Sequence, residues 1–158
     1  MCFKRKWTKF TPTQNYLDAV KDITTVSKLD LFLNNIKPKA DVGDYWQTPE
    51  ETLNLLTGDC EDYARLALDI LVRVMGITDA RFVVYNGYTA SNKKGGHAVC
   101  VFQENNQLSV FTGFALKKGF TDYEEIGHSF YPKGIKYMEV RNDEGKVVSR
   151  KFKLFGRL

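Results

Sequence analysis

The chain has 158 residues, of which 43% are hydrophobic and 27% are charged, and its formal net charge is +4 at pH 7. This balance is typical of a globular protein and excludes an intrinsically disordered chain. The length favours one domain over 1–158, with a helical part over about 1–76 and a β-sheet part over about 80–158. Basic residues concentrate in 3–9 and 146–158, where solvated ends explain them, so we expect no nucleic-acid partner.

The location of the protein is inferred from what its sequence lacks. No run of apolar residues is long enough for a transmembrane helix, and the N-terminus lacks the apolar stretch of a signal peptide. The irregular spacing of Cys2, Cys60 and Cys100 indicates neither a disulfide framework nor a zinc ribbon, and it fits a reducing compartment. We expect a cytoplasmic protein with no membrane insertion, and the small size also suits a phage-encoded one.

Helical periodicity dominates the first half of the chain. In 11–36 apolar residues recur mostly at three- and four-residue intervals, although the β-branched run 23–26 makes two shorter helices an alternative to one. The segment 48–56 predicts a short helix, since Thr-Pro-Glu-Glu is a typical helix start. A longer helix is expected from Asp59, a suitable N-cap, to Gly76, a suitable stop.

Strand patterns replace the helical ones in the second half. Alternation predicts strands over 81–88, 97–102, 108–114, 134–140 and 147–155. Turn signals occur at Asn86-Gly87, Lys94-Gly95-Gly96, Asn105-Asn106 and 142–145. Helices followed by an antiparallel sheet give an α+β fold class.

Two residues stand out as candidates for chemistry. Cys60 would be the first residue of its helix, where the dipole favours a thiolate. His97 opens the strand 97–102, and alternation places it on the face opposite to Cys100, which we therefore interpret as a small core residue. His128 falls in an expected loop, and we interpret it as a solvated surface residue. These residues alone favour a buried structural role for Cys60.

The segments "YWQTPEETL", "GDCEDYARLALDILVRVMGI" and "GGHAVCVF" (45–53, 58–77 and 95–102) resemble the bacterial transglutaminase-like cysteine proteinases. This family is related to the LapG-type periplasmic proteases and, more distantly, to papain-like and transglutaminase enzymes. The resemblance covers about 42–114, and the order of a cysteine on a helix and then a histidine on a strand matches the family. It implies a papain-like, transglutaminase-like core in which N-terminal helices pack on an antiparallel sheet.

The resemblance also implies an activity and the residues that carry it. Cys60 would be the nucleophile and His97 the general base and acid of a thiol-dependent hydrolase, a cysteine peptidase acting on a protein or peptide amide. Transfer of the acyl group to an amine uses the same residues and is an alternative. The backbone N–H of Cys60 is expected to donate to the oxyanion, with Gln47 or Trp46 as a second donor or wall. Packing in the core is an equally good interpretation of Trp46.

One position departs from the family. Relatives orient the histidine with an aspartate on the next strand, whereas this chain has Thr112 there, in "VFTG" (110–113). A threonine hydroxyl can accept a hydrogen bond from the imidazole but brings no charge, which weakens catalysis. An inactive domain that serves as a binding or structural module is therefore an alternative, and Asp122 is a second candidate to reach His97.

The acidic residues around the cysteine have two interpretations. In the LapG-type relatives calcium lies beside the catalytic cysteine, and Asp59 and Glu61 match the acidic positions that hold it, so the resemblance implies a Ca²⁺ site, although the chemistry requires no cofactor. In the alternative, Asp59 caps the helix and Glu61 is solvent-exposed. Asp62 would then pair with Arg65 or Arg81. Either way, three carboxylates raise the pKa of a neighbouring thiol.

Overall fold

The computed structural model describes residues 7–40, 45–113 and 115–154. The helices that precede the sheet are α1 (Gln14–Val20), α2 (Val26–Leu33), α3 (Pro49–Leu55) and α4 (Cys60–Arg73). The strands of the sheet are β3 (Arg81–Tyr88), β4 (Lys94–Glu104), β5 (Gln107–Phe111), β6 (Leu116–Phe120), β7 (Gly134–Arg141) and β8 (Val147–Leu154). Two short strands, β1 (Lys37–Pro38) and β2 (Thr57–Gly58), form a parallel pair, and α5 (Tyr123–Phe130) lies between β6 and β7. The predicted α+β class is confirmed.

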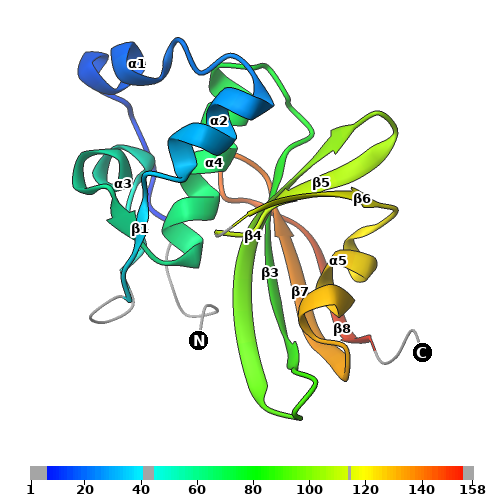
Figure 1. Ribbon diagram of the computed structural model, residues 1–158. Helices are drawn as coiled ribbons and strands as arrows, with labels where there is room; N and C mark the ends of the chain where they lie inside the picture. Colours follow the sequence, from blue (N-terminus) through cyan, green and yellow to red (C-terminus); the bar gives the residue numbers. More distant parts are fainter. Residues whose placement is uncertain (1–6, 41–44, 114, 155–158) are drawn as a thin grey trace.

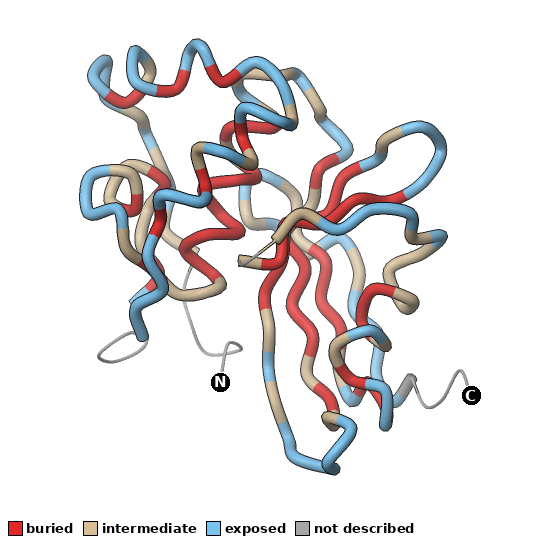
Figure 2. Tube along the Cα trace, viewed as in Figure 1, coloured by how far each residue is buried: buried red, intermediate tan, exposed pale blue. Residues whose placement is uncertain are grey.

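The sheet has the order β6-β5-β4-β3-β7-β8, and every neighbouring pair is antiparallel. Figure 1 shows α1 to α4 gathered on one side of the sheet and α5 on the other. Buried residues concentrate along the middle strands and on the helix surfaces that meet them (Figure 2). One core cluster, on the side of α4, contains Ala98, Cys100 and Phe102, and a second contains Val99 and Val101. The alternation predicted for β4, with Cys100 in the core, is confirmed.

The helix starts follow the local sequence. Thr13, Thr25, Thr48 and Asp59 are the N-caps of the first four helices. The β-branched residues 23–25 lie between α1 and α2 and Val26 begins α2, so the alternative of two shorter helices holds, because branched side chains restrict the helical backbone. Among the described residues, no helix combines the length and the apolar composition that crossing a bilayer requires.

Two predicted turns are instead parts of strands. Asn86-Gly87 lies in β3, with an irregularity in register there, and Lys94-Gly95-Gly96 lies in β4. The glycines serve close packing rather than chain reversal, because a Cβ on Gly96 would lie 2.8 Å from the Asn86 side chain. The chain reverses between these two segments, where the N–H of Thr89 donates to the carbonyl of Lys93 at 2.9 Å.

The other predicted turns connect strands of the sheet, and four elements were not predicted. Asn105 and Asn106 form a turn with φ of 51° and 64°, and 142–145 joins β7 to β8. The sequence did not predict β6, α5 or the short strands β1 and β2. His128 therefore lies in a helix, not in a loop, and its buried Nδ1 has no hydrogen-bond partner among the described residues.

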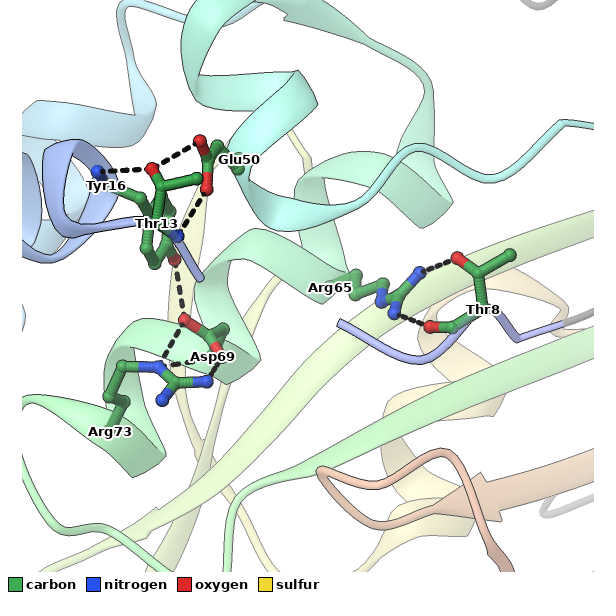
Figure 3. A network of polar contacts seen from close by, with 7 residues as sticks. All are labelled: Thr8, Thr13, Tyr16, Glu50, Arg65, Asp69 and Arg73. Atoms are coloured by element: carbon green, nitrogen blue, oxygen red, sulfur yellow. Dashed lines mark hydrogen bonds and ion pairs between the residues drawn. The ribbon is translucent and has the colours of Figure 1, made fainter. Parts of the chain in front are cut away.

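Polar contacts tie the N-terminal segment to α4 (Figure 3). The buried guanidinium of Arg65 donates to the hydroxyl of Thr8 at 3.2 Å and to the Thr8 carbonyl. Its burial lowers the pKa of Arg65 to about 10, so it stays charged at neutral pH. One turn further, the carboxylate of Asp69 accepts from the Tyr16 hydroxyl at 2.6 Å and pairs with Arg73 at 2.9 Å. These contacts fix the position of α4, whose first residue is the candidate nucleophile.

Candidate active site

The motif Gly-Asp-Cys-Glu-Asp builds the start of α4. Asp59 is the N-cap, and its Oδ1 accepts from the N–H groups of Glu61 at 3.1 Å and Asp62 at 3.2 Å. Asp62 returns the contact by accepting from the N–H of Asp59 at 3.1 Å, which completes a capping box. Gly58 is required for this fold-back, since a Cβ there would lie 2.8 Å from the Cβ of Asp62. The expected cap is confirmed, and among the described residues the N–H of Cys60 has no hydrogen-bond partner.

Gln47 contacts the start of α4 through Asp62, and Trp46 packs in the core cluster that contains α4. The second oxygen of the buried Asp62 carboxylate accepts from the N–H of Gln47 at 2.8 Å. Trp46 is only 3% exposed and packs on Phe82, with ring centroids 5.4 Å apart, so core packing describes it. Neither residue lines the cavity beside Cys60, and a role of either in the oxyanion hole stays a prediction.

A small cavity opens beside the cysteine. Its volume is about 190 Å³, and it lies between the β1–β2 pair, the start of α4 and Gly113. The N–H of Lys39 donates to the carbonyl of Gly58 at 2.9 Å, which holds one wall against the residues that precede Cys60. Cys60 is therefore half-buried and adjoins a space that a small group can enter.

The thiol of Cys60 is held in its neutral form. It donates to Oε2 of Glu61 at 3.5 Å. Glu61 is 4% exposed, so the expectation of a solvent-exposed Glu61 is wrong: its side chain is buried, with Oε2 against the thiol. Burial, and then the charge of Glu61, raise the pKa of Cys60 to about 12, while a hydrogen bond from the backbone of Ala98 lowers it. Cys60 is thus a protonated thiol at neutral pH.

The contact with Ala98 places the sulfur at an edge of β4. Ala98 directly follows His97 in this strand. Pairing of β4 with β5 begins only at Cys100, opposite Phe111, so within the described residues no strand pairs with 94–99 on that side. Cys60 therefore reaches β4 at the point where β5 has left it.

The side chain of His97 lies on the other face of β4, toward α5, and among the described residues no hydrogen bond joins its ring to the Cys60 sulfur. Its ring lies 4.9 Å from that of Phe130 in α5. Burial and the charge of Lys117 lower the pKa of His97, whereas a hydrogen bond to the backbone of Thr112 raises it, and the net shift is downward. A bond with that sign stabilises the protonated ring, so the imidazole is the donor and the backbone carbonyl accepts. At neutral pH the imidazole is uncharged and can accept a proton.

The orienting contact comes from a different atom of Thr112 than expected. Its hydroxyl donates to the carbonyl of Ala115 at 3.1 Å and accepts from the N–H of Ala115 at 3.2 Å, where it closes the turn after β5. Asp122 caps α5 by accepting from the N–H of Glu125 at 2.8 Å. The sequence did not predict three of the contacts at this site. They are made by the backbone of Ala98, the backbone of Thr112 and the buried carboxylate of Glu61.

The carboxylates around Cys60 do not complete a metal site by themselves. Within 7–40, 45–113 and 115–154, no group of three or more His, Cys, Asp and Glu side chains is arranged to hold an ion. One oxygen of Asp59 is engaged by the helix start, and Glu61 faces the thiol. A calcium ion here would need water or other oxygens for most of its shell.

Comparisons with known proteins agree with this architecture. A family model described as a transglutaminase-like domain matches residues 9–117, more than half of the chain. The structure of Legionella pneumophila LapG is similar, with a TM-score of 0.54 and 21% identity over 84% of this chain and 76% of that one. Its calcium-bound form gives 0.54 and 22% over 78% and 70%, and its EGTA-treated form 0.54 and 19% over 87% and 77%. At these identities the likeness shows a shared fold. No curated protein matches the chain.

Proposed function

Because the chain belongs to the transglutaminase-like domain family, we propose that it is a thiol-dependent hydrolase that cleaves a protein or peptide amide through an acyl-enzyme on Cys60. One arrangement carries the proposal. The Cys60 thiol contacts the backbone of Ala98 at the open edge of β4. His97, which precedes Ala98 in this strand, has a neutral imidazole that donates to the backbone of Thr112.

The reaction starts from an uncharged pair. As the sulfur attacks the carbonyl carbon, His97 takes the thiol proton and the carbonyl oxygen gains the negative charge. The unengaged N–H of Cys60, at the positive end of α4, donates to that oxygen. The imidazolium then gives its proton to the leaving amine as the C–N bond breaks. Water adds to the acyl-enzyme with His97 as base, the C–S bond breaks, and the thiol regains its proton.

The group that orients His97 limits the rate. A backbone carbonyl fixes the ring and accepts its N–H, but it stabilises the imidazolium with a dipole rather than a full charge. The raised pKa of Cys60 adds to the barrier. These two observations favour the second candidate function, a domain that binds a polypeptide without cleaving it. Amine transfer differs from hydrolysis only in the acceptor and is distinguished below.

A polypeptide substrate suits the open edge. Gly96 has the same parity in β4 as Ala98, so its N–H and C=O point to the side that β5 leaves free. An extended chain can add to such an edge by main-chain hydrogen bonds, which brings an amide to the sulfur.

The proposal includes a cytoplasmic location. It also includes calcium at Asp59 and Glu61, a cation that would offset the charge of Glu61, but no step depends on it.

Acetylation by p-nitrophenyl acetate tests the proposal. We expect a burst of nitrophenolate and an acetyl group on Cys60, located by mass spectrometry of peptides, with none on the buried Cys100. Cys60→Ala should abolish the burst, and His97→Ala should slow it by about 100-fold or more, the usual contribution of a general base.

Two outcomes decide between the alternatives. If native Cys60 is acetylated no faster than in the urea-unfolded chain, the protein is not a thiol hydrolase and the binding-module function is favoured. Adding a primary amine to the reaction then separates hydrolysis, which releases acetate, from transfer, which releases the acetamide.

A further inference from the structure

The face of the sheet that carries α4 is only partly covered. The helix packs over the part of β4 that contains Ala98, Cys100 and Phe102. The same face continues past Ala98 to Gly96 and Lys94, and in Figure 1 this hairpin end of β3 and β4 projects beyond α4. A groove of about 730 Å³ lies on it, a volume within the range of about 300–1,000 Å³ that is typical of ligand sites.

A cross-strand row forms the floor of this groove. Register places Gly96 opposite Asn86, Asn86 opposite Tyr137, and Tyr137 opposite Phe152, from β4 across to β8. Residues directly opposite share a face, so the two aromatic rings lie side by side, with centroids 5.1 Å apart. Phe152 is 67% exposed, which is unusual for so large an apolar side chain on a sheet.

The floor leads to the candidate nucleophile. Gly96 lies two residues from Ala98 on the same face, a distance of about 7 Å along a strand, and Ala98 contacts the sulfur of Cys60. Because Gly96 has no side chain, nothing projects from β4 at this position between the groove and Cys60. A substituent there would meet the Asn86 side chain at 2.8 Å. A chain lying in the groove thus continues toward the thiol.

The rim of the groove is positively charged. Lys94, Lys136 and Lys153 line it, and all three are exposed. No aspartate or glutamate lines the groove, and among the described residues none of these lysines has a carboxylate partner. An apolar floor with an unpaired basic rim is complementary to a peptide that combines aromatic or aliphatic side chains with acidic ones.

From this complementarity we propose that the groove, formed by Gly96, Asn86, Tyr137, Phe152 and the three rim lysines, binds an acidic, apolar segment of the polypeptide substrate. An apolar side chain of that segment lies on Tyr137 and Phe152, and its carboxylates meet the lysines. The neighbouring amide then reaches Cys60. This assignment of substrate class rests on the proposed hydrolase function.

Peptide binding to the Cys60→Ala chain, which cannot turn over, tests the groove. The probes are two fluorescein-labelled synthetic peptides that share a central Phe, flanked in one by Glu and in the other by Lys, and the readout is anisotropy. We expect the Glu peptide to bind about tenfold more tightly or better, with a preference that weakens as salt is added. Lys94→Glu/Lys136→Glu should invert the preference.

Two further variants separate the groove from general effects. Lys21→Glu/Lys28→Glu makes the same change of net charge at the exposed C-cap of α1 and at an exposed position of α2, and it should leave the preference in place. Phe152→Ala should weaken both peptides by about tenfold, since aromatic anchors carry much of the energy of an interface. Because Phe152 is mostly exposed, this variant is expected to keep the melting temperature of the parent.

Equal binding of the two peptides, or equal effects of the two double variants, would overturn the proposal. So would competition by an oligonucleotide, if the groove variants abolish that competition. A dimer in sedimentation that Phe152→Ala dissociates would also overturn it. The last two would assign the groove to nucleic acid or to a second copy. Binding needs no chemistry, and acetylation of Cys60 needs no groove. Loss of charge selectivity with normal acetylation of Cys60 would therefore contradict only the groove. Normal charge selectivity without acetylation of Cys60 would contradict only the hydrolase function.

Discussion

One face of the sheet behaves differently along the length of a single strand. On the part of β4 beneath α4, Cys100 and Phe102 are at most 1% exposed and belong to the main core. On the part beyond α4, the same face carries Gly96 at one end of a row and the exposed Phe152 at the other. Period-two alternation is the same in both parts, so coverage by the helix, not the strand pattern, makes one a core and the other a surface. Cys60 lies at the boundary.

The largest expected effect comes from removing an aromatic ring in each part. Phe102→Ala should lower the free energy of unfolding by about 3–5 kcal/mol, because it leaves a cavity in a fully buried site. Phe152→Ala should change it by no more than about 1 kcal/mol, because the ring already faces solvent. Urea unfolding followed by tryptophan fluorescence measures both. Similar losses in the two variants would mean that the groove part is also a core.

At the boundary, the charge of Glu61 is expected to control the thiol. Glu61→Gln removes a negative charge that raises the pKa of Cys60, so the pKa should fall toward its ordinary value. For each unit that it falls, alkylation by iodoacetamide at mildly alkaline pH should speed up by about tenfold. Peptide mapping assigns the label, and Glu144→Gln, at an exposed position of the β7–β8 turn, is the matched control. An unchanged rate in Glu61→Gln would show that Glu61 does not act on the thiol.

The fold was largely predictable from the sequence because caps and alternation are local signals. Thr48, Asp59 and the run 23–26 marked the helix boundaries, and β-strand alternation gave the faces of β4. At the glycines the local signal does not match the structure. Gly95-Gly96 has the composition of a turn, but its lack of side chains serves close packing inside β4, which depends on a tertiary neighbour that the sequence does not reveal.

The candidate site was predictable only in part. Cys60 and His97 were identified by motif, but their protonation follows from burial and from backbone groups of Ala98 and Thr112, which no side-chain pattern encodes. Glu61 illustrates the same limit. A charged residue in the first turn of a helix is normally solvated, whereas the Glu61 side chain is buried and accepts from the Cys60 thiol.

Calcium is expected to have the smallest effect on the boundary. Since the described side chains offer little beyond Asp59 and Glu61, we expect weak binding and a rise in melting temperature of about 3 °C at millimolar calcium relative to EGTA. The Glu61→Gln chain should lose this rise, while Glu144→Gln should keep it. Identical melting curves with calcium and with EGTA would contradict the site.

The pairing of His97 with Cys60 is tested most directly by the pH dependence of Cys60 acetylation. The pKa of His97 is lowered from its ordinary value of 6.5, and only the neutral ring accepts the thiol proton. The rate should therefore fall as the pH drops, with an inflection below 6.5, in the parent chain and in His128→Ala. In His97→Ala, this fall of the rate at low pH should be absent. A fall that survives in His97→Ala, or an inflection above 6.5 in the parent, would contradict the account.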